Sequence, residues 1–107
     1  VAGADGDYAT ALTSLVSAIQ KARALGDLTA EIYFRTFLGN GLVANNRPAQ
    51  ALPMFDEAIA LGTKSPDSGY PIMPVIGKVR ALRAMNKREE ALRLIEESLR
   101  YSRESQI

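Results

Sequence analysis

The chain has 107 residues, of which 47% are hydrophobic and 23% are charged, with a formal net charge of +1 and no cysteine, histidine or tryptophan. These values are typical of one globular domain with a core of its own. They exclude disulfides and any catalysis or metal binding that depends on cysteine or histidine, and the near-neutral charge argues against a nucleic-acid-binding domain.

Apolar residues recur every three or four positions in five segments, and this spacing predicts five amphipathic helices. In chain order the segments are 8–22, 34–42, 51–59, 72–85 and 91–99. Turn residues separate them, in the order Gly26-Asp27, Asn45 to Pro48, Gly62 through Gly69, and Asn86. Asp67 and Ser68 are expected to cap the N-terminus of the fourth helix, with Pro71 and Pro74 in or near its first turn.

The sequence repeats itself with a period of 40 residues. The pairs Ala11-Leu12, Ala51-Leu52 and Ala91-Leu92 mark the period. Each pair is followed at equal offsets by a large, a small and a large residue, which are Leu15, Ala18 and Ile19, then Phe55, Ala58 and Ile59, then Ile95, Ser98 and Leu99. Small residues let two helices approach closely while large ones fill the groove between them, so the pattern predicts stacked helices.

One stretch is specific enough to suggest a family. Leu38-Gly39, Leu42, the turn at Asn46, and then Ala51, Phe55 and Ala58 resemble the tetratricopeptide-repeat (TPR) pattern without gaps. The resemblance covers about two and a half repeats, namely a half repeat over residues 6–26 and full repeats over 28–63 and 67–103. It implies an all-α fold, a right-handed α-solenoid or TPR-like superhelix of five antiparallel helices.

The chain departs from that family in several places. Arg35 stands where the family often has an aromatic residue, Ser98 replaces the last small alanine, and the period is 40 residues where about 34 is usual. The longer period implies helices extended by about a turn. It also leaves a HEAT-like α-solenoid, with a period of about 40 to 47 residues, as an alternative.

The half repeat would leave the first helix without a partner on one face. We therefore expect either a longer parent protein with an additional N-terminal helix or a homo-oligomer formed through the first helix. An ordinary solvated face is a third interpretation, because polar residues such as Ser14, Gln20 and Lys21 also occur there. The last helix fits a terminal cap, because its charged residues predict a polar outer face. These residues are Arg93, Glu96, Glu97, Arg100, Arg103 and Glu104.

Proteins that resemble TPR domains bind peptides or partner helices on a concave wall formed by the first helix of each pair. By that resemblance the peptide-binding groove is lined by Tyr33, Thr36, Asn40 and Val43 on one helix and by Met73, Ile76, Arg80 and Arg83 on the next.

A basic run crosses the second wall of this groove. Five cations and no carboxylate lie between Lys78 and Arg88. Two interpretations stay open. The cations could stabilise the C-terminal end of the helix dipole, or Arg80 and Arg83 could bind a carboxylate of an acidic protein or peptide ligand.

The remaining signals narrow the function class. Gly39-Asn40-Gly41 superficially matches a dinucleotide-binding fingerprint, but no strand precedes it, so close helix packing explains the glycines better. We expect no enzyme activity, no metal or cofactor, and no nucleic-acid or membrane partner. The sequence has no leader-like segment, so we expect a cytoplasmic protein–protein interaction scaffold. An oligomerisation module, or a sensory or regulatory module fused to an effector domain, is the alternative.

Overall fold

The computed structural model describes residues 3–64 and 69–105, and in these ranges all the regular structure is helical. The five helices are α1 (Gly3–Leu25), α2 (Leu28–Ala44), α3 (Pro48–Lys64), α4 (Ile72–Ala84) and α5 (Arg88–Ser105). Each of the five predicted helices is confirmed, and each is longer than its apolar segment or close to it in length. The all-α class is therefore established.

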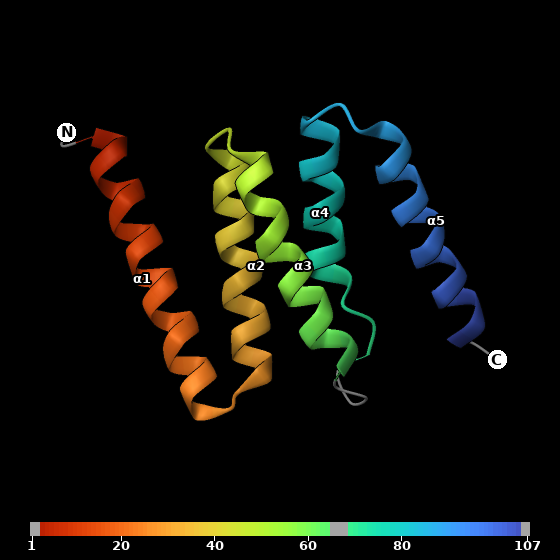
Figure 1. Ribbon diagram of the computed structural model, residues 1–107, viewed down its shortest axis with the longest axis horizontal. Helices are drawn as coiled ribbons and strands as arrows, with labels where there is room; N and C mark the ends of the chain where they lie inside the picture. Colours follow the sequence, from red (N-terminus) through yellow and green to blue (C-terminus); the bar gives the residue numbers. More distant parts are fainter. Residues whose placement is uncertain (1–2, 65–68, 106–107) are drawn as a thin grey trace.

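Consecutive helices run antiparallel and follow one another across the molecule in chain order (Figure 1). Each helix packs on the next one along the chain, and α2 also packs on α4, so α2, α3 and α4 touch one another mutually. The Cα extents are 52 × 37 × 17 Å. Because helix axes pack 8 to 10 Å apart, the shortest dimension corresponds to about two layers of helices.

Three of the four connections share one backbone geometry. At each, a residue with positive φ ends the helix, namely Gly26 at 71°, Asn46 at 62° and Asn86 at 61°. The next residue donates its N–H to the carbonyl five residues back, from Asp27 to Ala22 at 2.9 Å, from Arg47 to Leu42 at 2.8 Å and from Lys87 to Leu82 at 2.8 Å. This is the Schellman pattern, and Gly and Asn stand there because they tolerate left-handed backbone best.

The helix starts are set by short local signals. Asp27 caps α2, since its carboxylate accepts a hydrogen bond from the backbone N–H of Ala30 at 3.0 Å. Pro48 is the first residue of α3, where a missing N–H has no consequence. The N-cap prediction for α4 was wrong: the helix begins at Ile72 with Pro71 in the cap position. Asp67 and Ser68 lie outside the described residues.

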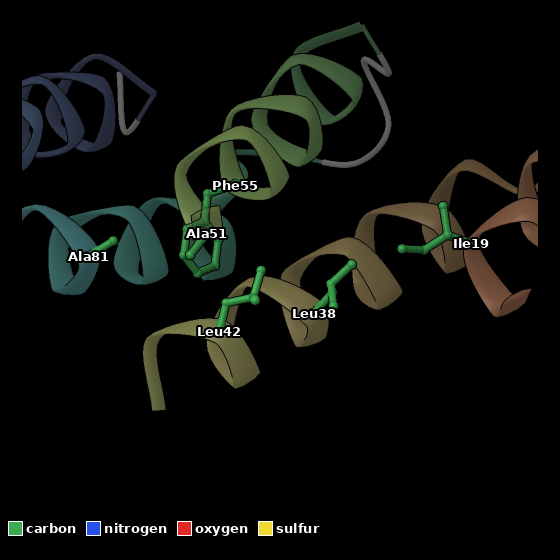
Figure 2. Packing of buried hydrophobic residues seen from close by; sticks show 6 residues of the cluster. All are labelled: Ile19, Leu38, Leu42, Ala51, Phe55 and Ala81. Carbon is green, nitrogen blue, oxygen red and sulfur yellow. The ribbon is translucent and has the colours of Figure 1, made fainter. Parts of the chain in front are cut away.

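The centre of the core is the side chain of Phe55 on α3, which is completely buried (Figure 2). It lies with Ala51, also on α3, between Leu42 of α2 and Ala81 of α4, while Leu38 extends the cluster to Ile19 of α1 (Figure 2). One large residue surrounded by alanines and leucines thus joins α2, α3 and α4.

Two glycines allow the helices to approach the Phe55 ring. A Cβ atom placed on Gly39 would lie 2.6 Å from Cε1 of Phe55, and one on Gly77 would overlap the same ring atom more strongly. The ring therefore fills the space that both missing side chains leave, one on α2 and one on α4. Close helix packing at Gly39, expected from the sequence, is confirmed, whereas a Cβ on Gly41 would meet no atom within 4 Å.

Candidate binding surfaces

A hollow of the described surface lies between α2 and the start of α4, next to the end of α3. We refer to it as the α2–α4 hollow. Its volume is about 320 Å³, and none of the described residues that line it is charged. The lining consists of Thr29, Ile32, Tyr33, Thr36, Phe37, Asn40, Gly62, Tyr70, Pro71, Ile72, Met73 and Pro74.

Two aromatic side chains on α2 stand at the edge of this hollow. Tyr33 and Phe37 are one helical turn apart, and their ring centroids are 4.9 Å apart with the ring planes tilted by 55°. Tyr33 also meets Phe34 edge to face at 6.5 Å. Even so, Tyr33 is 60% exposed and Phe37 is 51% exposed, so the pair presents a fixed aromatic surface to solvent.

The start of α4 supplies the facing wall. Met73 is 61% exposed and Ile72 is 47% exposed, while Pro74 is buried. The two prolines that flank these residues, Pro71 and Pro74, restrict the backbone there. The hollow is therefore apolar on both walls.

Three of the eight predicted groove residues line the α2–α4 hollow with accessible side chains: Tyr33, Asn40 and Met73. Thr36 also contributes to the lining, but it is only 5% exposed and its hydroxyl donates to the backbone carbonyl of Ile32 at 2.8 Å. Because its hydroxyl is bonded to the helix backbone and its side chain is buried, Thr36 contributes to packing and not to ligand binding. Val43 lies instead against the hydrophobic core.

The other three predicted residues belong to a different part of the surface. Ile76, Arg80 and Arg83 line a hollow between α4 and α5, and a second hollow beside it is also lined by Arg80 and Arg83. The structure therefore divides the predicted groove between two places. Arg80 and Arg83, the two arginines of the basic run on α4, lie on the α5 side, away from the aromatic pair.

Within the basic run, the cations differ in their environment. The ammonium group of Lys78 forms an ion pair with Asp56 of α3 at 2.7 Å. Arg80 and Arg83 are exposed, and neither has an ion-pair partner among the described residues. Two guanidinium groups thus remain available to an anionic partner.

Phe37, Tyr70 and Ile72 line the α2–α4 hollow without being among the eight predicted groove residues. Phe37 and Ile72 follow the apolar spacing of their helices, which is typical of buried positions, yet both are about half exposed. Tyr70 lies in the long connection before α4, where its hydroxyl is 2.7 Å from that of Ser98 and its ring centroid is 4.6 Å from that of Tyr101. The spacing of apolar residues could not predict these binding positions. It identifies the apolar face of a helix, but it does not show whether another helix packs on that face.

The described residues offer no group of three or more His, Cys, Asp or Glu side chains that could hold a metal ion. In the same ranges, no helix has the length and apolar character that crossing a bilayer requires. Comparisons with protein-family models, with curated proteins and with solved structures give no match for the chain.

Proposed function

We propose that this chain is a protein-interaction module that binds an apolar peptide segment in the α2–α4 hollow. The observation that carries the proposal is the exposure of Tyr33, Phe37, Ile72 and Met73 around one concavity whose described lining residues are all uncharged. Leaving such side chains in water is unfavourable by about 25 cal/mol per Å² of apolar surface, and clustered apolar surface of this kind marks binding sites. A concave, mostly apolar wall with few polar groups is what ligand sites share.

The polar group suited to orient such a peptide is Asn40. Its side chain is half-buried on the wall of the α2–α4 hollow, and an amide offers both a donor and an acceptor to a peptide backbone. Because none of the described residues that line the hollow is charged, the preferred peptide has apolar side chains that insert beside Phe37 and Met73. The acidic ligand expected from the sequence fits Arg80 and Arg83 instead.

The repeat architecture is part of the same proposal. A right-handed, TPR-like solenoid is supported by the identical turns at Asn46 and Asn86, which are separated by one repeat period, and by the packing of Phe55 on Gly39 and Gly77. The radius of gyration of 14.8 Å exceeds the value of about 13 Å for a compact domain of this length, as an extended stack requires. Such stacks serve as binding scaffolds.

The experiment is a selection of displayed 12-residue peptides on the immobilised chain, followed by measurement of the dissociation constant for purified peptides. We expect Phe37→Ala and Met73→Ala each to weaken binding at least tenfold. Leu25→Ala is the matched control, because Leu25 is 83% exposed and lies outside the hollow. It should leave the constant within twofold of the original.

Selected peptides that bind all three variants equally would contradict the proposal.

Sedimentation velocity of the peptide-free chain tests the alternative function, which is self-association. A concentration-dependent dimer that disappears in Phe37→Ala would assign the hollow to a second copy. A dimer unaffected by that change would point to α1 or α5 as the contact.

A further inference from the structure

Helix α5 exposes a row of large apolar side chains. Leu92 is 56% exposed, Ile95 is 41% exposed and Leu99 is 50% exposed, while Ala91 beside them is buried. The sequence predicted a polar terminal cap here. That prediction was incomplete: the charged outer face exists, but the apolar stripe that should be buried is left about half uncovered.

The equivalent apolar stripes in the two earlier repeats are each covered by a following helix. At the same offsets α1 carries Leu12, Leu15 and Ile19, and α3 carries Leu52, Phe55 and Ile59. All six of these are buried or half-buried, and a following helix packs on each element, α2 on α1 and α4 on α3. In the described part of the chain nothing occupies the corresponding position beside α5.

The uncovered stripe forms one wall of a groove, which we call the α4–α5 groove. It consists of two adjoining hollows that share Arg80, Arg83 and Ile95. Along α5 the groove extends from Arg88 to Ser102. At a rise of 1.5 Å per residue this span is about 21 Å, or four helical turns.

The charges around the groove specify the partner further. Arg80, Arg83 and Arg88 line it, and none of the described residues that line it is an aspartate or glutamate. The carboxylates of α5 lie outside this lining. Guanidinium groups form paired hydrogen bonds with carboxylates, so acidic side chains along the flank of a docked helix would complement the groove.

We propose that the α4–α5 groove binds an amphipathic α-helix of a partner protein, about four turns long, with Asp or Glu along the flank that faces α4. Its apolar face covers Leu92, Ile95 and Leu99 as α4 covers the matching face of α3. Ile95 corresponds by the repeat to Phe55, which packs on glycines of the neighbouring helices. The partner helix therefore carries Gly or Ala opposite Ile95.

The test is a selection from a library of displayed 20-residue helices that share a fixed apolar stripe. The central residue of the stripe is varied among Gly, Ala and Leu. The residues that flank the stripe are varied among Glu, Lys and Gln. The bait is the full 107-residue chain. We expect at least fivefold enrichment of Glu over Lys on one flank, and of Gly or Ala over Leu at the centre. The bait with Arg80→Glu and Arg83→Glu should reverse the flank preference.

The matched control bait carries Arg93→Glu and Arg100→Glu, the same charge change on exposed α5 residues outside the groove lining. It should select as the original chain does, and so should the Phe37→Ala bait, which tests the α2–α4 hollow alone. Equal recovery of Glu and Lys flanks, or equal effects of the two arginine pairs, would overturn the proposal. So would a chain dimer that Ile95→Asp dissociates, since a second copy would then occupy the groove.

Discussion

At the scale of single residues, the packing of Phe55 on Gly39 and Gly77 leaves no room for a larger residue at either glycine. Gly39→Ala and Gly77→Ala each place a methyl group in space that the completely buried Phe55 ring occupies. Overpacking of this kind destabilises by about 1 to 3 kcal/mol, which exceeds the gain of up to about 1 kcal/mol from replacing a helical glycine by alanine. Both variants should therefore lower the free energy of unfolding in urea.

Gly41→Ala is the control for these two substitutions. It lies in the same helix as Gly39, and its Cβ would have no neighbour within 4 Å. It should therefore stabilise the chain by about 0.5 to 1 kcal/mol. If Gly39→Ala and Gly41→Ala changed stability in the same direction, the packing of Phe55 against α2 would be wrong.

A second residue-scale feature is the ion pair between Glu31 and Arg35 on α2. The Nε atom of Arg35 lies 2.9 Å from Oε2 of Glu31, and their side chains are only 6% and 12% exposed, in that order for Glu31 and Arg35. Glu31, one turn before Arg35, thus supplies the counter-charge that the largely buried guanidinium group requires.

Glu31→Ala should lower the free energy of unfolding by about 3 kcal/mol, because it leaves Arg35 buried without a counter-charge. Glu57→Ala, on the exposed surface of α3, should change it by no more than about 0.5 kcal/mol. Replacing Glu31 and Arg35 together by leucine should recover most of the loss. Equal urea midpoints for the two single variants would show that the ion pair contributes nothing.

At the scale of elements, the shared turn geometry makes a quantitative prediction. Asn46→Ala and Asn86→Ala each put alanine, which tolerates left-handed backbone less well than asparagine, at a positive φ, so each should cost about 1 kcal/mol. Glycine at either position should stay within about 0.5 kcal/mol of the original. Urea unfolding of the four variants tests this, and clearly unequal losses at the two turns would argue against equivalent repeats.

The elements also show how far the sequence could lead. Helical spacing and turn residues are local signals, so all five helices and the positions of the tight turns followed from them. The N-cap of α4 did not, because a long connection precedes this helix and Pro71 takes the cap position without a side-chain hydrogen bond. The exposure of Phe37 and Leu92 could not be predicted either, since it depends on whether another helix lies over the stripe. For the same reason the sequence could not show that Arg80 lies on the side of α4 that faces α5.

At the scale of the whole molecule, stability should be graded along the stack. Helices α2, α3 and α4 pack on one another, whereas α1 and α5 each pack on one neighbour along the chain. Native-state hydrogen exchange should therefore give the largest opening free energies for amides of α3 around Phe55 and smaller ones for α5. Uniform protection in all five helices would indicate one cooperative unit without graded stability.

The arrangement on which both proposed surfaces rest is the packing of α2 and α4 against the ring of Phe55. The most direct measurement is the nuclear Overhauser effect from the Phe55 ring protons in the isotope-labelled chain. We predict strong cross-peaks to the Hα protons of both Gly39 and Gly77, because the ring occupies the space beside each glycine. Cross-peaks to only one of the two glycines would contradict the stacked arrangement.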